Sequence, residues 1–247
     1  NTVTVTLNVG ATDDAPVAVS DSFTVAEDSG ATTLDLIAND TDTEGDPITI
    51  TSVTQPTGGT VTITNGGADV SFTPDADFNG TTSFTYTING GDTATATITV
   101  TPVNDAPVLE PVQAGGTFTE AADASAQDLS TTGSLTVSDA DLGDTLTATV
   151  NGTPTLNWNG GTLTAAQQAT LLDALGTGKL TFDSSVSADG TSQSVGWTWD
   201  PSAVDLDFLN QGDQLTITYS LSVSDGTAST ASQFIVFTIM GSEDSPT

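Results

Sequence analysis

The chain has 247 residues, of which 32 are acidic and only Lys179 is basic, so its formal net charge is −31. It contains no histidine and no cysteine. This composition excludes the basic surfaces that bind nucleic acid or anionic membranes. It also excludes Ser-His-Asp triads, Cys-His nucleophiles and the usual zinc sites. The length is sufficient for two domains with hydrophobic cores.

The excess of negative charge indicates that cations are held close to the protein. Carboxylates at this density repel one another and oppose a compact state unless counter-ions are near. Ligands rich in oxygen and poor in nitrogen favour hard cations, calcium first and magnesium second. Two alternatives stay open: the acids only keep the surface soluble, or they reflect adaptation to salt, which is compatible with bound calcium.

The absence of cysteine is interpreted as secretion without disulfides, with metal ions in their place. The sequence has neither an apolar run long enough to span a membrane nor a signal peptide, and it begins within a strand pattern. We therefore expect a segment of a longer protein that acts outside the cell.

Residues 1–12 are predicted to be the terminal strand of a preceding repeat. Positions 2–9 alternate polar with apolar residues, which is typical of a strand with one buried face. A single strand is not stable alone. We therefore expect it to pair with a sheet edge, either in the first domain or in a neighbouring molecule.

Three related tetrapeptides divide the rest of the chain. They are DDAP at position 13, NDAP at position 104 and EDSP at position 243, and each follows an alternating strand. We interpret them as linkers at 13–16, 102–107 and 241–247. The linkers then separate a first domain at 17–101 from a second domain at 108–240.

The first domain is predicted to contain seven strands. Runs rich in threonine and valine alternate at period two, and clusters of Gly, Asn and Asp separate them every eight to twelve residues, which is typical of a β-sandwich. The expected strands, A to G, are 17–25, 31–38, 48–54, 60–64, 69–73, 82–88 and 93–101.

The second domain is predicted to carry an insertion at about 152–196 that contains one short helix. Residues 164–167 read as a capping box, Gly176 as the C′ residue, and Ala169, Leu172 and Leu175 (or Ala165) as the apolar stripe. Three tryptophans, at positions 158, 197 and 199, flank the helix. We expect them to pack it onto a sheet; the alternative is an exposed platform for a ligand.

The acidic residues gather where a sandwich places its loops. In such a fold the A–B and E–F loops lie at one pole and the B–C and F–G loops at the other. The E–F loops of the two domains match closely, since Asp75-x-Asp77-Phe precedes Phe84-x-Tyr86 and Asp205-x-Asp207-Phe precedes Ile217-x-Tyr219. Repeated acids in diverged sequences suggest one repeated physical role.

Loops at these poles and the linkers provide the candidate calcium ligands. They are Asp13, Asp14, Glu27, Asp40, Asp42, Asp75, Asp77, Asn104, Asp105, Glu120, Asp139, Asp141, Asp205, Asp207, Glu243 and Asp244. Asp92 and Asp225, in the F–G loops, are further candidates for which a solvated turn is an equal alternative.

Calcium binds six to eight oxygens in flexible geometry, and an Asp-x-Asp spacing directs two carboxylates to the same side of a loop. Because the ligands come from two domains and a linker, ion binding would also stiffen the joint. Without an ion the carboxylates repel one another, and the joint would open. For any single Asp-rich turn, a solvated surface is the alternative.

Two stretches resemble known families. The glutamate after strand A, the acid pair before strand F, the Asn-Asp linker and the Asp-x-Asp loop are similar to cadherin repeats, and residues 74–86 (PDADFNG through FTY) to bacterial cadherin-like or Ig-like tandem repeats. Residues 108–240 resemble the VCBS repeat through GSLTVSDAD at 133, LTAAQQATLL at 163 and LTITY at 215. The resemblance implies an all-β fold of tandem Ig-like or cadherin-like antiparallel β-sandwiches.

The same resemblance implies that the chain comes from a giant RTX-type adhesin. Such adhesins are exported by type I secretion and act at the bacterial surface in cell adhesion and biofilms. The segment would then be a calcium-dependent extender, monomeric, whose partners are adjacent repeats of the same chain. We expect no nucleic acid, no membrane insertion and no small ligand. The alternative is a module that binds sugar or peptide through the second domain. An enzyme, such as a glycosidase with two carboxylates, is not expected.

Overall fold

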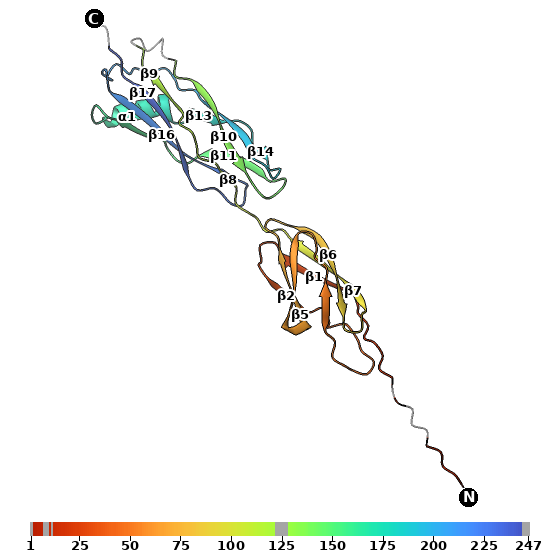
Figure 1. Cartoon of the computed structure of the whole chain (residues 1–247). Coiled ribbons are helices and arrows are strands. Elements are labelled where there is room, and N and C mark those ends of the chain that lie inside the picture. Colours follow the sequence, from red (N-terminus) through yellow and green to blue (C-terminus); the bar gives the residue numbers. More distant parts are fainter. Residues whose placement is uncertain (1, 7–9, 11, 122–127, 244–247) are drawn as a thin grey trace. The chain divides into compact units, whose positions relative to one another are not determined.

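The computed structural model describes residues 2–6, 10, 12–121 and 128–243. The chain divides into two compact units, Asn1–Val103 and Asn104–Thr247. Both units consist mainly of strands, coloured red to yellow in the first and green to blue in the second (Figure 1). The all-β fold is confirmed.

The first unit is a sandwich of two sheets, and the seven predicted strands are all present. One sheet has the order β1-β7-β6-β3 and the other β2-β5-β4. The strands are β1 (Asp21–Ala26), β2 (Thr32–Leu34), β3 (Ile50–Val53), β4 (Gly59–Thr64), β5 (Asp69–Pro74), β6 (Gly80–Ile88) and β7 (Thr93–Thr101).

Within these sandwiches, one strand pair in each unit is parallel. In the first unit β1 pairs with β7 in parallel. The physical reason is that the chain enters the unit at one end and leaves at the other, so the first and last strands run in the same direction. Placed side by side, they can only form a parallel ladder.

The core of the first unit is built from the alternating face of β6 and β7. Phe84 and Tyr86 are buried, and each lies opposite a small residue, Ala96 or Ala94. This pairing of large with small side chains lets the side chains of β6 and β7 pack closely together.

The hydroxyl of Tyr86 contacts several oxygen atoms inside the first unit. It lies 2.8 Å from Val19 O, 3.0 Å from Asp21 Oδ2, 3.1 Å from Asp40 Oδ1 and 3.2 Å from Leu36 O. One phenol thereby ties the segments before and after β2 to strand β6. Burial raises the pKa of the Asp21 carboxyl above its usual range, while the hydrogen bond with Tyr86 acts in the opposite direction.

The second unit is also a sandwich of two sheets, with the orders β13-β15-β10-β8 and β14-β11-β16-β17-β9, and β12 pairs with β16. Its strands are β8 (Val108–Leu109), β9 (Gly116–Thr119), β10 (Thr131–Ser138), β11 (Thr145–Val150), β12 (Thr155–Trp158), β13 (Leu180–Phe182), β14 (Val186–Ser187), β15 (Gln193–Trp199), β16 (Gln214–Ser224) and β17 (Gln233–Met240). Here β9 and β17 form the parallel pair.

The predicted helix is present as α1 (Ala165–Leu171), and it continues into a π-helical turn, η3 (Leu172–Gly176). Its capping box is confirmed, with the Thr164 side chain accepting from Gln167 N and the Gln167 side chain accepting from Thr164 N. Gly176 is not the C′ residue: it ends the π turn, and Gly178 takes the left-handed conformation with φ +72°.

The apolar stripe of the helix also differs from the prediction. Leu171, Ala174 and Leu175 are buried, whereas Ala165 and Ala169 are exposed. The wider π turn rotates the last residues relative to the first turn, so a stripe counted at regular helical spacing shifts.

Trp199 confirms the expected role of a tryptophan in holding the helix. Its Nε1 donates to Leu175 O at 3.1 Å, and the hydroxyl of Tyr219 donates to Gly176 O at 2.7 Å. Trp197 packs edge-on against Phe237 instead. Lys179 lies between the helix and β13, where its Nζ donates to Ser202 Oγ at 2.6 Å.

Residues 2–6 form no strand with the first unit, and Val3 and Val5 are exposed. Residue 1 and residues 7–9 and 11 lie outside the described part. Pairing of this segment with another molecule stays a prediction. Within the described ranges, no helix is long and apolar enough to cross a bilayer.

We predict that Tyr219→Phe lowers the stability of the second unit by about 1–3 kcal/mol, because the buried Gly176 carbonyl loses its shorter hydrogen bond and keeps only that from Lys179 N at 3.2 Å. All three tryptophans lie in this unit, so tryptophan fluorescence during urea unfolding reports on it alone. Tyr86→Phe, in the first unit, is the matched control. An equal shift of the fluorescence transition by the control would contradict the assignment.

Candidate metal centre

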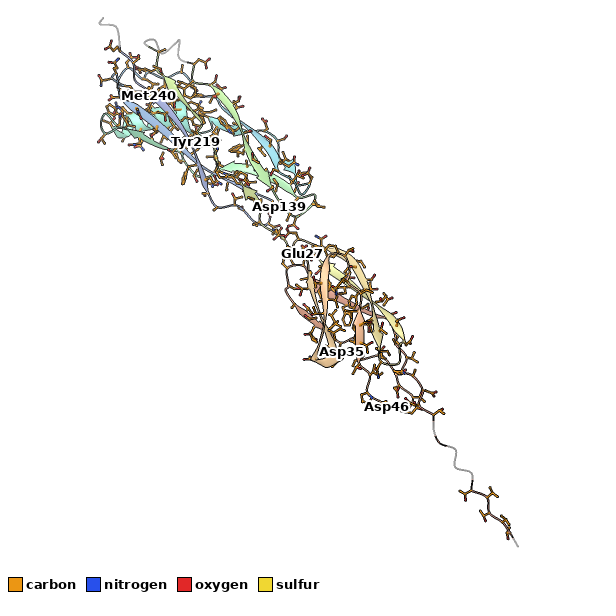
Figure 2. All side chains as sticks on the ribbon, in the orientation of Figure 1. Glu27, Asp35, Asp46, Asp139, Tyr219 and Met240 are labelled. Atoms are coloured by element: carbon orange, nitrogen blue, oxygen red, sulfur yellow. The ribbon has the colours of Figure 1, made fainter. Side chains whose placement is uncertain are left out.

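Three carboxylates from two loops converge at one end of the second sandwich. Asp139 directly follows β10, Asp144 directly precedes β11, and Asp225 directly follows β16. One oxygen of each lies within 4.8 Å of the others. Figure 2 shows Asp139 at the end of its sandwich, beside the loops that join the strands.

Asp139 is the buried member of this group, with 4% of its surface exposed. Its Oδ1 accepts a hydrogen bond from Asp141 N at 3.0 Å, whereas within the described residues its buried Oδ2 has no hydrogen-bond partner. Burial raises the pKa of the Asp139 carboxyl above its usual range, and the nearby charges of Asp141, Asp225 and Asp144 raise it further. A buried carboxylate oxygen with no donor is costly unless a cation occupies the space beside it.

Backbone hydrogen bonds fix the loop of Asp225 and the loop that Asp139 and Asp144 share. The Oδ1 of Asp225 accepts from Ala228 N at 2.6 Å and also from Thr227 N. These bonds, led by that of Ala228, lower the pKa of Asp225. Ala188 N donates to Asp144 O at 2.8 Å, which holds the second loop against the segment after β14.

Linker residues at the start of the second unit are bonded to the same loops. Asn104 Nδ2 donates to Asp225 Oδ2 at 3.1 Å, and Asp105 N donates to Asp141 Oδ2 at 2.7 Å. The predicted ligands Asn104, Asp105, Asp139 and Asp141 are therefore brought together within this unit.

The donor set fits a hard cation. All of its side-chain ligands are carboxylate oxygens, which calcium prefers. Asp139, Asp144 and Asp225 would hold the ion, and the orphaned oxygen of Asp139 is the observation that supports the fit. Asp141, Asn104 and Asp105 would shape the surroundings of the ion.

The opposite end of the second unit carries another part of the predicted set. Glu120 is buried, and its Oε1 accepts from Ser242 N at 3.0 Å. Asp205 and Asp207 are exposed, and Asp205 Oδ1 accepts from Asp207 N at 3.0 Å. Glu243 is exposed. Asp244 lies outside the described residues.

The corresponding end of the first unit has the same glutamate. Glu27 is buried; its Oε1 accepts from Val103 N at 2.6 Å and its Oε2 from Asn79 Nδ2 at 3.1 Å. Asp28 and Asp77, both at φ +56°, each place a carboxylate oxygen within 4.8 Å of the other. Asp75 is exposed in the same loop as Asp77.

The other end of the first unit does not assemble its predicted ligands in this way. Asp40 Oδ1 accepts from Val19 N at 2.7 Å, and Asp42 Oδ1 accepts from Glu44 N and Asp46 N at 3.0 and 2.9 Å.

Asp14 N donates to Glu44 Oε2 at 3.2 Å, and Asp13 is exposed. Asp92 accepts from Ala18 N at 2.9 Å, which lowers its pKa. In the described part of this end, no three acidic oxygens lie within 4.8 Å of one another.

Sequence reasoning gave Asp225 too little weight and left Asp144 out of the ligand set. The signal was available, because the B–C and F–G loops share a pole and both residues lie directly next to a strand. The role of Asn79, which follows the Asp75-x-Asp77 pair and bonds Glu27, had no sequence signal beyond its position.

Residues 13–101 match the family model of the bacterial Ig domain (Big_9). The match covers most of the first unit and none of the second. No curated protein matches the sequence.

Among solved structures, the chain is similar to the PcdhgB3 EC1-4 fragment, with 11% identity, a TM-score of 0.50 and coverage of 93% of this chain and 50% of that one. It is also similar to human CDH23 EC21-23, with 14% identity, a TM-score of 0.48 and coverage of 93% and 70%. A third, the endo-fucoidan hydrolase MfFcnA4, has 20% identity, a TM-score of 0.31 and coverage of 97% and 31%.

These likenesses concern the fold, which is that of cadherin-like and Ig-like β-sandwiches. The chain spans half of the PcdhgB3 fragment and less than a third of the hydrolase.

We predict that Asp139→Asn stabilises the second unit when the ions are chelated, because it removes a buried charge crowded by other carboxylates. In the unchanged protein, calcium at ten to a hundred times its dissociation constant should add about 1.4–2.7 kcal/mol. The variant should lose most of this gain. Tryptophan-detected urea unfolding with EDTA and with calcium measures both effects.

The matched control is Asp173→Asn, which removes one exposed carboxylate from η3. It should leave the calcium-induced gain unchanged. A gain that survives in Asp139→Asn would show that the ion binds elsewhere.

Proposed function

We propose that this chain is an extracellular spacer in a large bacterial surface adhesin, and that calcium makes it stiff. The carboxylate group of Asp139, Asp144 and Asp225, with its orphaned buried oxygen, carries the proposal. Bacterial Ig domains are typical of surface proteins, and the cadherin-like fold supports a tandem arrangement. The resemblance of the second unit to VCBS repeats, and of the whole to RTX-type adhesins, supports the same role.

Stiffening follows from the way the linker is held. Val103 N is bonded to Glu27 within the first unit, and the next two residues, Asn104 and Asp105, are bonded to Asp225 and Asp141 within the second. An ion beside Asp139 would fix the loops to which Asn104 and Asp105 are bonded. It would thereby limit rotation of the chain at the linker. When the ions are removed, repulsion among the carboxylates would loosen these loops.

Calcium is the ion that suits this role. Extracellular modules of this kind bind it with dissociation constants of about 10⁻⁴–10⁻³ M. At such affinity the ion is bound outside a cell and lost inside it, so a chain of repeats would stay flexible until export. No residue set in the described part is proposed to be catalytic.

Small-angle scattering of the full chain tests the proposal. We expect millimolar calcium to increase the radius of gyration and to narrow the distribution of conformations relative to EDTA. Asp139→Asn should lose this response, and Asp173→Asn should keep it. Calorimetry measures calcium binding independently. If calcium binds but the scattering curves in calcium and EDTA coincide, the ion stabilises only its own loops, and the spacer proposal is rejected.

A groove on the second unit favours a second candidate function, the binding of a partner peptide. It has a volume of about 540 Å³ between α1 and the loop that precedes β16. Its lining combines apolar side chains, two carboxylates and two uncharged polar groups: Ala166, Gln167, Thr170, Leu171, Val204, Asp205, Asp207 and Phe208.

This combination suits a segment that carries lysine or arginine beside an apolar residue. It suits a sugar less well, because the contacts of the Trp158 ring are already made within the unit. The half-buried Trp158 donates its Nε1 to Asp213 and packs edge-on against Phe208. The backbone at Gly161 lies against its ring, since a Cβ there would be 2.9 Å from Trp158 Cζ3.

Calorimetry with a short peptide of alternating leucine and lysine tests this candidate. We expect measurable binding that Thr170→Trp weakens at least about tenfold, or 1.4 kcal/mol, because the new ring fills the groove from an exposed position. A peptide with glutamate in place of lysine is the control. Equal binding of both peptides would exclude recognition by Asp205 and Asp207.

A further inference from the structure

The first and last strands of the first unit are neighbours. β1 and β7 pair in parallel over six register positions, from Asp21↔Ala96 to Ala26↔Thr101. The Thr101 hydroxyl adds a bond to Val25 O at 3.2 Å. The chain enters this unit into β1 and leaves it from β7, so these two strands are the ones attached to the rest of the protein.

The second unit has a similar parallel pair, although the short strand β8, paired with β10 in the other sheet, precedes it. β9 and β17 pair in parallel from Gly116↔Phe237 to Thr119↔Met240. Gly115 N extends the ladder by donating to Val236 O at 2.9 Å.

A buried glutamate ends both ladders in the same way. Glu27 N donates to Thr101 O at 3.0 Å, and its carboxylate accepts from Val103 N, two residues further on. Glu120 N donates to Met240 O at 2.9 Å, and its carboxylate accepts from Ser242 N, again two residues further on. The two glutamates are 2% and 4% exposed, so water competes little for these bonds. Figure 2 labels Glu27 and Met240, which mark the ends of the two ladders.

Tension on the two ends of the first unit acts on β1 and β7 in opposite directions along their common axis. In the second unit it acts on β9 and β17 in the same way once the short pairing of β8 with β10 has opened. The hydrogen bonds between parallel strands are then sheared together and cannot open one by one. A bond from a charged carboxylate to a backbone N–H is about twice as strong as a neutral one. The glutamate bond lies at the end of the ladder where the chain leaves the unit, so it is loaded first.

We infer that each unit is a load-bearing module, in which the parallel ladder is the mechanical barrier and Glu27 or Glu120 is the latch that closes it. The inference rests on the proposed spacer role for its biological use, since a spacer between a cell and its attachment site is under tension. The latch bonds themselves join only groups of the protein.

Single-molecule pulling of the full chain by its two ends, in EDTA, tests the inference. Unfolding should release roughly 280 Å for Asp21–Thr101 and roughly 460 Å for Val108–Met240, at about 3.5 Å per residue, so that each event identifies its unit. Glu27→Ala should lower the unfolding force of the shorter event only. Glu120→Ala should lower that of the longer event only.

A general loss of stability has to be separated from loss of the latch. Val61→Ala provides the control, because Val61 is 1% exposed in β4, which lies in the sheet that does not contain β1 or β7. It should lower the free energy of unfolding, measured with urea, and leave the unfolding force nearly unchanged.

The inference is overturned if Glu27→Ala and Val61→Ala lower the force equally at equal loss of stability. It is also overturned if neither glutamate variant changes the force. Because the pulling is done in EDTA, its outcome is independent of the calcium response in scattering. A failed latch would leave the spacer proposal standing, and a failed spacer would leave the latch measurable.

Discussion

Carboxylates in this chain have almost no basic side chains to pair with, and backbone N–H groups take that place. Asp42 binds two N–H groups of its own loop, Asp92 binds the N–H of Ala18, and Asp225 binds two beyond β16. Each of these bonds fixes a loop at the end of a strand. The negative charge that would otherwise disrupt a compact fold thus shapes the ends of both sandwiches, and the rest of the structure depends on this arrangement.

The same constraint explains why Asp139 differs from its neighbours. Its buried position gives one oxygen a backbone donor and leaves the other without a partner among the described residues. Where no N–H group reaches the carboxylate oxygen, a cation can balance its charge. The first unit solves the comparable problem at Asp40 with the hydroxyl of Tyr86 and the N–H of Val19.

The two units share a framework that differs in detail. Tyr86 and Tyr219 occupy corresponding places in β6 and β16, but only Tyr219 has a donor to its oxygen, the Nε1 of Trp199 at 3.0 Å. Tyr86 faces two carboxylates instead. The helix of the second unit supplies the carbonyls that Tyr219 binds, which ties the insertion to the core.

Strand positions and the capping box at Thr164 could be predicted from the sequence, because alternation and capping are local signals. The parallel pairing of β1 with β7 and of β9 with β17 is set by the path of the chain through each unit, which no local pattern records. The π turn that moves the helical stripe from Ala169 to Leu171 is likewise a tertiary effect. At the candidate site, Asp139 and Asp141 followed from their spacing, whereas the closeness of Asp225 depends on how two distant loops meet.

The solitary lysine has a consequence for the life of the protein outside a cell. Proteases that cut after lysine or arginine find a single susceptible peptide bond in the whole sequence, between Lys179 and Leu180. Leu180 is buried at the start of β13, paired with Trp199, and the lysine side chain is bonded to Ser202. A protease of that specificity needs an extended, accessible substrate, so the folded second unit withholds the one bond that the sequence offers.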